Sequence, residues 1–216
     1  MRIVPLLPDS CTPESWRSFE AVELAWTGQL HPEWARLGGR GPKVHALHLP
    51  GLPWGPGLGE TALAALRAGL GADFLVLRAE APGDRSELSA FMAVLEGLLE
   101  VTQGTGVKLA LRPASGAAPE LVRRLREARG EAVGFCWDAL IPPLPEHLGA
   151  LSDRLFCAVG APGDDFGPIQ RLGYRWNLAI PARDPESHRE EAARLAQAYP
   201  PVLFPADLDP EPKERP

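Results

Sequence analysis

Eight short apolar segments, each followed by a stretch with helical spacing, constrain the fold of this chain more than any other feature. The segments cover residues 2–7, 21–26, 44–49, 74–79, 107–112, 132–138, 154–160 and 174–180. Several are apolar along most of their length, which is typical of parallel strands buried on both faces. Strands that alternate with helices indicate βαβ units and a parallel sheet. The pattern predicts a compact α/β fold, a (βα)8 TIM-type barrel, with an open doubly wound sheet as the alternative.

Helix signals between the segments support this alternation. Thr12-Pro13 and Asp184-Pro185 each place a capping side chain before a proline at the first helical position. Apolar residues recur at helical spacing at positions 88, 91, 95, 98 and 99. A TIM-type barrel typically takes about 250 residues. At 216 residues the chain must therefore have short loops, and we expect abbreviated helices at 32–37 and 167–172.

Length and charge limit the organisation of the chain and its partners. We expect one domain at residues 1–204, followed by a flexible, charged and Pro-rich tail at 205–216. A net charge of −6 argues against nucleic acid or an anionic membrane as partner, and no segment is apolar for long enough to span a bilayer. The N-terminal segment does not match a signal peptide, and the three cysteines form no CxxC motif. These features predict a cytoplasmic protein whose partner is a small molecule.

Two of the predicted strands carry the most specific motif in the chain. GVKLALRP at 106–113 is followed by a predicted helix and then by AVGFCWD at 132–138. This pair resembles strands five and six of the xylose isomerase-like barrel superfamily, which includes sugar phosphate isomerases and epimerases and AP endonucleases. VHALHLP at 44–50 and AVEL at 21–24 are similar to the third and second strands of that family. The resemblance implies an isomerase or epimerase that uses a divalent metal at the C-terminal mouth of the barrel.

The resemblance also implies a set of metal ligands, most of which this chain lacks. The family typically uses a Glu on strand five, an Asp on strand six, a His on strand seven and a Glu on strand eight. The Asp is present as Asp138, whereas Arg112 occupies the position of the strand-five Glu. One carboxylate alone binds a hard cation weakly. We therefore expect no cofactor, with Mn, Mg or Zn held at Asp138 as the alternative.

Strand alternation places Arg112 and Asp138 at the same end of the predicted barrel. Positions 108, 110 and 112 share one face of their strand, and positions 134, 136 and 138 share one face of the next. If the bulkier opposite faces meet the helices, these faces line the barrel, and Arg112 and Asp138 project at the C-terminal mouth, where barrel active sites lie. The pair is interpreted either as an anion-binding guanidinium oriented by a carboxylate or as a structural salt bridge.

Two further residues are candidates for proton transfer. His48 ends the third strand on the face of positions 44 and 46, and imidazole titrates near neutrality, so His48 is a candidate acid or base. Glu23 lies in an apolar strand, where a buried carboxylate needs a partner such as Arg78 or His48. It is either a base with a perturbed pKa or a structural residue. His45 is expected to face away from His48 and to be structural.

Arg78 and Trp54 complete the predicted binding residues. Arg78 ends the fourth strand and either binds substrate with Arg112 or pairs with Glu80 or Asp84. Trp54 lies in the loop after the third strand, where its ring can stack on a sugar. Both positions belong to the predicted mouth.

Other residues near the strand ends have structural interpretations. Trp137 and Trp176 are expected to pack in the core or against helices. Asp164 and Asp165 follow the seventh strand either as turn or capping residues or as cation ligands together with Asp138.

These residues leave three functional interpretations. The first is an isomerase or epimerase in which His48 or Glu23 moves a proton next to a carbonyl and Arg112 anchors a phosphate or carboxylate. The second is a non-catalytic protein that binds a small carbohydrate-like or anionic metabolite, or that serves as a partner subunit. The third is a DNA repair enzyme of the AP endonuclease type, which the net charge of −6 and the missing metal ligands disfavour.

Overall fold

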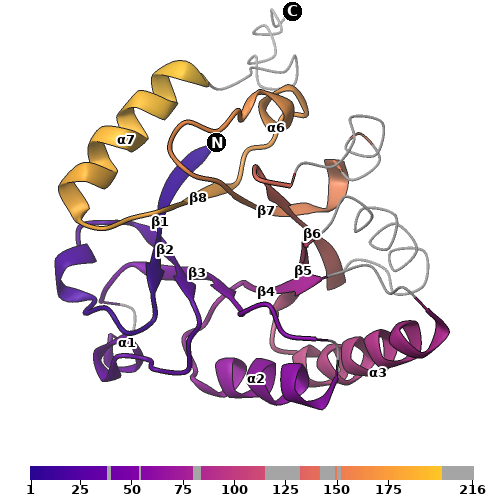
Figure 1. The fold of residues 1–216 in the computed structure, drawn as a ribbon. Helices are drawn as coiled ribbons and strands as arrows, with labels where there is room; N and C mark the ends of the chain where they lie inside the picture. Colours follow the sequence, from indigo (N-terminus) through magenta and orange to yellow (C-terminus); the bar gives the residue numbers. More distant parts are fainter. Residues whose placement is uncertain are drawn as a thin grey trace, which may run out of the picture.

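The strands of the chain form one closed, all-parallel barrel (Figure 1). The computed structural model describes residues 1–37, 40–53, 55–79, 84–114, 132–141, 149 and 152–200. Each strand pairs with its neighbour in sequence, and the eighth pairs with the first through a register that joins Arg2 to Asn177. The predicted (βα)8 TIM-type barrel is therefore confirmed, and the open sheet is excluded. The predicted tail at 205–216 lies outside the described residues.

The secondary structure follows the predicted alternation, and every predicted strand is found to within three residues at each end. The strands are β1 (Arg2–Pro8), β2 (Ala21–Ala25), β3 (Lys43–His48), β4 (Phe74–Ala79), β5 (Lys108–Pro113), β6 (Val133–Asp138), β7 (Leu155–Val159) and β8 (Asn177–Pro181). The described helices are η1 (Glu14–Trp16), α1 (Pro32–Arg36), α2 (Pro56–Arg67), α3 (Arg85–Thr102), η3 (Ser152–Arg154), α6 (Gly167–Arg171) and α7 (Pro185–Ala198). The helices α1 and α6 are as short as expected.

The two predicted helix caps have different outcomes. Asp184 caps α7 as predicted, because its Oδ1 accepts hydrogen bonds from the backbone N–H groups of Glu186 and Ser187 at 3.1 and 2.9 Å. The prediction that Thr12 caps a helix is wrong. The segment forms only the single 3-10 turn η1, whose first backbone bond runs to Pro13 O and which has no side-chain cap.

Apolar side chains form two separate clusters, one on each side of the sheet. Bulky residues of the outer face, among them Leu109, Phe135 and Trp137, pack beneath the helices. The inner cluster consists mainly of small residues: Val4, Ala21, Ala46, Val76, Ala110, Cys136, Cys157, Val159 and Ala179. An eight-stranded barrel has room for little more than such side chains in its interior. This confirms the prediction that the small faces of β5 and β6 line the barrel.

Two strand irregularities add an extra inward side chain each. The register between β2 and β3 shifts after Val22, so that His45 is the unpaired residue of a bulge, and the register between β6 and β7 shifts in the same way at Phe156. His45 therefore points inward with Ala46, whereas Val44 belongs to the outer cluster. The prediction that His45 faces away from His48, and that position 44 shares the face of His48, is wrong because a bulge interrupts the alternation.

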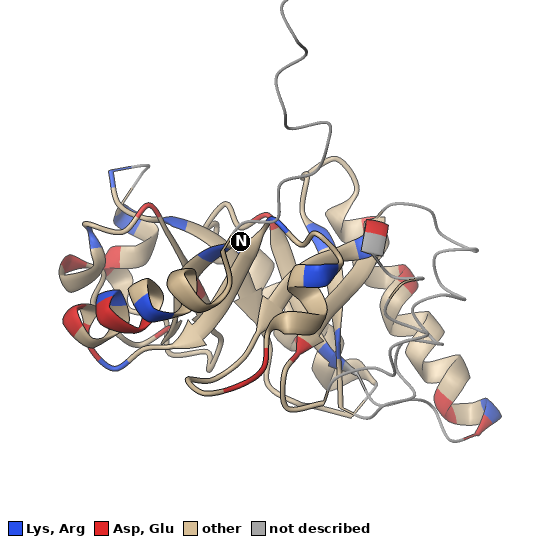
Figure 2. Ribbon diagram, turned by 90° about the horizontal axis from the view of Figure 1, so that it is seen from above, with Lys and Arg blue, Asp and Glu red and all other residues tan. Residues whose placement is uncertain are grey.

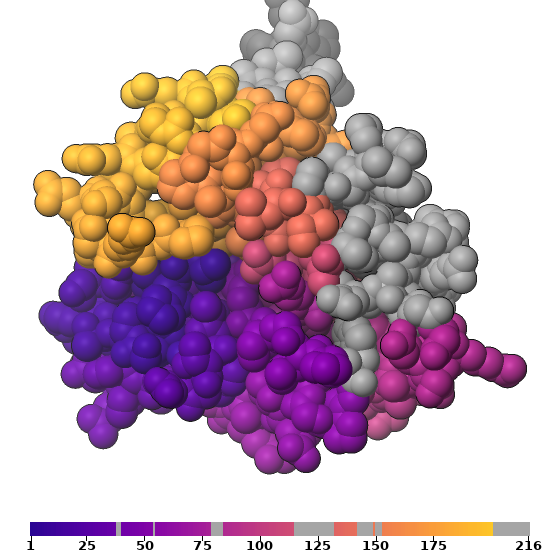
Figure 3. Space-filling view, viewed as in Figure 1, coloured from indigo at the N-terminus to yellow at the C-terminus, as the bar shows by residue number. Residues whose placement is uncertain are grey.

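The N-terminal and C-terminal elements of the described chain contact each other, and residues of both charge signs are distributed around the barrel. The strand β1 pairs with β8 and also contacts α7. The N-terminal surface, in indigo, accordingly adjoins the C-terminal surface, in yellow, in Figure 3. Basic and acidic residues are interspersed around the barrel (Figure 2). Within the part of the chain that the structure describes, no helix has the length and apolarity needed to cross a bilayer.

Candidate functional site

Arg112 and Asp138 pair at the C-terminal mouth of the barrel, as alternation predicted. Arg112 Nε donates to Asp138 Oδ2 at 2.7 Å, from the end of β5 to the end of β6. The other carboxylate oxygen, Oδ1, accepts the backbone N–H of Leu140 at 3.0 Å. The Asp138 side chain is 5% exposed and that of Arg112 is 24% exposed, so the carboxylate is buried beneath a guanidinium that still reaches solvent.

A second guanidinium stands beside the first. Arg78 and Arg112 are register partners in adjacent strands β4 and β5, so both side chains leave the sheet at the same level and on the same face. Arg78 is exposed and packs against the loop after β3, where a Cβ added to Gly51 would lie 3.1 Å from Arg78 Cδ. Among the residues that the structure describes, no carboxylate pairs with Arg78. Asp84 instead caps α3 through Glu87 N.

Two predicted residues of this region, Trp54 and Glu80, lie outside the described residues. The described ends of β4, β5 and β6 hold two guanidinium groups and one carboxylate, that of Asp138, which is already paired with Arg112.

Below the mouth, Glu23 is fully buried between two histidines. Its Oε2 lies 2.5 Å from His48 Nε2, and its Oε1 lies 3.0 Å from His45 Nδ1. Burial raises the pKa of Glu23, but hydrogen bonds from His45 and His48 lower it by more, so the pKa lies below its ordinary value and the side chain is ionised at neutral pH. The predicted partner His48 is present. The second partner, His45, was missed because only the bulge in β3 turns it inward.

The hydrogen bonds to Glu23 fix where the imidazole protons are. An ionised carboxylate only accepts, so His48 carries a proton on Nε2 and His45 carries one on Nδ1. His48 Nδ1 is buried and has no hydrogen-bond partner among the residues that the structure describes. In neutral His48 this nitrogen has a free lone pair, which is the property of a proton acceptor.

The described residues do not fit the metal centre that the family resemblance implies. Arg112 places a fixed positive charge against Asp138, whose two oxygens are both engaged. Asp164 and Asp165 are turn and capping residues, because they accept hydrogen bonds from Ala161 N and Gly167 N. No group of three or more His, Cys, Asp or Glu side chains within the described ranges could hold a metal ion.

Asp9, the residue that follows β1, also lies at the mouth and was not among the predicted site residues. It is fully buried and accepts hydrogen bonds from Thr27 N at 3.0 Å and Gly28 N at 3.1 Å, which fixes the loop after β2 at the mouth. The signal in the sequence is an acidic residue directly after an apolar strand. Its engaged oxygens give it a structural role.

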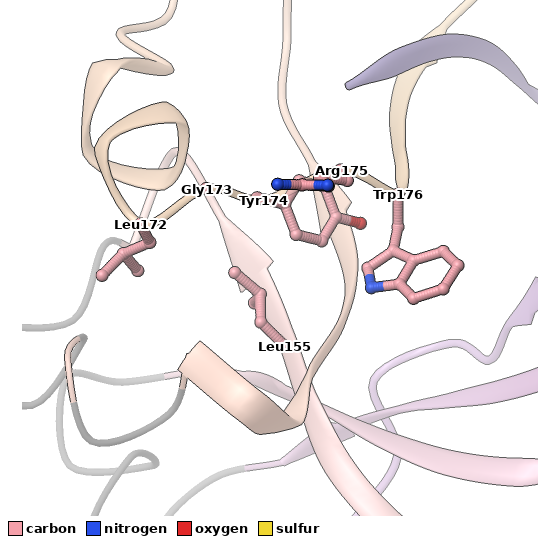
Figure 4. Close-up of a pocket in the computed structure, with 6 residues that line it drawn as sticks. All are labelled: Leu155, Leu172, Gly173, Tyr174, Arg175 and Trp176. Atoms are coloured by element: carbon pink, nitrogen blue, oxygen red, sulfur yellow. The ribbon is translucent and has the colours of Figure 1, made fainter. Parts of the chain in front are cut away.

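A small pocket of about 110 Å³ lies at the opposite end of the barrel (Figure 4). It is lined by Leu155, at the start of β7, and by the segment 172–176 that precedes β8. Trp176 borders the pocket and is 62% exposed, so the prediction that it packs in the core or against a helix is wrong. Trp137, by contrast, is buried in the outer cluster as predicted. The pocket is separate from the mouth, because parallel strands all begin at the same end.

Solved structures confirm the fold that the sequence resemblance implied. The chain is similar to a xylose isomerase domain protein from Planctomyces limnophilus, with 14% identity, coverage of 91% of this chain and 94% of that one, and a TM-score of 0.61. It is also similar to a D-allulose 3-epimerase from Methylomonas sp., with 14% identity, coverage of 94% and 92%, and a TM-score of 0.64. For a D-tagatose 3-epimerase-like protein the values are 17%, 92% and 97%, and 0.61.

No protein-family model and no curated protein sequence matches the chain. At these identities the likeness to solved structures establishes the architecture alone. The chain thus has the fold of the xylose isomerase-like and sugar epimerase-like barrels.

Proposed function

We propose that the chain binds a small anionic, carbohydrate-like metabolite, such as a sugar phosphate or sugar acid, at the C-terminal mouth. The observation that carries this proposal is the 2.7 Å bond from Arg112 Nε to the buried Asp138. Guanidinium has five N–H donors, so this bond leaves the two terminal NH2 groups for a ligand. No other described residue accepts a hydrogen bond from them. A guanidinium held at one edge by a carboxylate is suited to bidentate contact with a phosphate or carboxylate.

Arg78 supports the same proposal, because it supplies a second positive charge at the neighbouring strand end. At the ends of β4, β5 and β6, two guanidinium groups, of Arg78 and Arg112, stand beside one described carboxylate, that of Asp138, although the chain carries −6 in total. An anion is therefore attracted to the mouth and not to the surface in general. Trp54, in the loop after β3, is proposed to cover the carbohydrate part of the ligand.

Calorimetry with inorganic phosphate and a panel of sugar phosphates and sugar acids tests the proposal. Loss of one charged hydrogen-bonding group weakens binding by about 1.5–3 kcal/mol, which is about 10- to 100-fold in Kd. Arg112→Gln and Arg78→Gln should each show this loss. The control is Arg67→Gln, a change in an exposed residue of the last turn of α2, and it should leave Kd unchanged. Binding that does not respond to Arg112→Gln would contradict the proposal, as would no binding at all.

We further propose that this barrel has lost the divalent metal of the fold family. The support is the position of Arg112, whose guanidinium occupies the space beside Asp138 that a cation would need. Titration with Mn2+, Mg2+ and Zn2+ should give no binding that depends on Asp138. Tight binding abolished by Asp138→Ala would show that a metal site persists.

A second candidate function is catalysis of proton transfer next to a carbonyl, as in an isomerase or epimerase. The observation that favours it is His48 Nδ1, a buried proton acceptor below the anion-binding residues, to which no described residue donates a hydrogen bond. Incubation with aldose and ketose phosphates in D2O, followed by NMR, should show deuterium entering the substrate, and His48→Ala should abolish it. If the ligand binds but no deuterium enters, the protein has a binding role only. Three free cysteines agree with a reducing, cytoplasmic location, which we also propose.

A further inference from the structure

The bulge in β3 brings a second histidine to Glu23, and this arrangement has its own chemical consequence. Without the bulge, His45 would point to the outer face and Glu23 would have one imidazole partner. With it, the two carboxylate oxygens are divided, Oε1 to His45 and Oε2 to His48. Both imidazoles come from the same strand, three residues apart, and hold Glu23 from two sides.

We infer that His45 is a positioning residue for His48. By occupying Glu23 Oε1, it orients the carboxylate so that Oε2 meets His48 Nε2, and this fixes His48 in the tautomer whose Nδ1 is free to accept a proton. The functional meaning of this inference rests on the proposed catalytic role of His48, but the tautomer itself can be measured without any ligand.

The surroundings of the three side chains favour a single arrangement. The side chain of Glu23 has no exposure, that of His48 has 4% and that of His45 has 12%, so water does not compete for these hydrogen bonds. The edge-to-face contact between His45 and Phe74, with ring centroids 5.0 Å apart, limits rotation of the imidazole. Cys136 and Cys157 face the same interior, and burial raises the pKa of both thiols well above the ordinary value, so they stay neutral.

The proton balance of the step is simple. A C–H bond next to a ligand carbonyl breaks, an N–H bond forms at His48 Nδ1, and the electron pair remains on the ligand, delocalised onto the carbonyl oxygen. His48 is then an imidazolium paired with the Glu23 carboxylate. Return of the proton to the ligand restores the starting state, so no oxidant or reductant is required.

NMR of the full chain labelled with 15N-histidine tests this inference. Long-range 1H–15N spectra at neutral pH distinguish the two tautomers, and single substitutions assign the five histidines. His48 should carry its proton on Nε2 and His45 should carry its own on Nδ1. In His45→Leu, His48 should lose its single tautomer, and its two 15N shifts should move toward each other. In His45→Asn, the side-chain amide nitrogen replaces Nδ1 as a donor, and the wild-type shifts should return.

A histidine outside the buried cluster provides the control. His31→Leu changes a histidine at the start of α1 and should leave the His48 signals unchanged. The inference is overturned if His48 keeps its wild-type tautomer in His45→Leu, or if wild-type His48 carries its proton on Nδ1. The wild-type spectrum decides the second point even if His45→Leu does not fold. Calorimetry with phosphate reports separately on the anion site, so its failure and the failure of this inference are distinguishable.

Discussion

Removal of the Asp138 carboxylate should destabilise the barrel by an amount that the geometry of the mouth sets. Removing one member of a fully buried ion pair typically costs about 3–5 kcal/mol. Asp138 is 5% exposed, but Arg112 is 24% exposed and can be partly hydrated after its partner is lost. We therefore expect about 2–4 kcal/mol for Asp138→Ala, which includes about 1 kcal/mol for the lost acceptor of Leu140 N. For a chain of this length, about 3 kcal/mol lowers Tm by about 6–12 °C.

Urea denaturation at pH 7, followed by tryptophan fluorescence and circular dichroism, measures this difference. Asp138→Asn is the matched control, because its amide oxygen still accepts one hydrogen bond while the charge is lost. We expect it to destabilise by about half as much as Asp138→Ala, since loss of the hydrogen bond and loss of the charge each contribute. The pair would be shown not to stabilise the mouth if Asp138→Ala lay within about 0.5 kcal/mol of the wild type, the range of ordinary surface substitutions.

Three other substitutions test the interior and the mouth. The pKa of Glu23 is lower in the folded chain than its ordinary value. The ionised side chain therefore contributes to stability at neutral pH, and this contribution is lost as the pH falls through the folded pKa. Glu23→Gln should accordingly lower the urea midpoint more at pH 7 than at pH 3. Gly134→Ala should destabilise by about 2–3 kcal/mol in the same assay, because its Cβ would lie 2.5 Å from the Phe156 ring. Asp9→Ala should lower the free energy of unfolding by about 2 kcal/mol, since the buried Asp9 carboxylate no longer accepts the N–H groups of Thr27 and Gly28, which are exposed residues and can bond to water instead. An effect below about 1 kcal/mol in either of these two variants would refute the packing or hydrogen-bonding argument.

Most of the barrel could be predicted from the sequence, because several of the buried parallel strands are apolar along most of their length and alternate with helical patterns. The inward and outward faces of β5 and β6 could also be predicted, since small and bulky residues alternate there without interruption. This alternation was enough to bring Arg112 and Asp138 together at the mouth. Their contact needs only that two adjacent strands end at the same level.

The interior of the site could not be predicted in the same way. A period of two residues assigns His45 to the outer face, and nothing in the residues of β3 marks the extra residue of a bulge. The same extra residue reverses the face predicted for position 44, which belongs to the outer cluster. Trp176 failed for a different reason: a large aromatic residue before a strand is usually packed, but here the segment turns its indole toward the solvent beside a shallow pocket.

The two bulges together explain why a charged group can lie at the centre of this barrel. They lie on β3 and β7, and each adds an inward ring, of His45 and Phe156. Phe74 contacts both, with ring centroids 5.0 Å from His45 and 5.3 Å from Phe156, so aromatic rings fill the N-terminal end of the interior. The side chain that Gly134 lacks would collide with Phe156, which shows that the space for this ring is specific. Water is thereby kept from Glu23 on that side, and the carboxylate must be satisfied by the histidines. The same irregularity in β3 that defeats sequence alternation thus supplies both the dry environment and the donor that it requires.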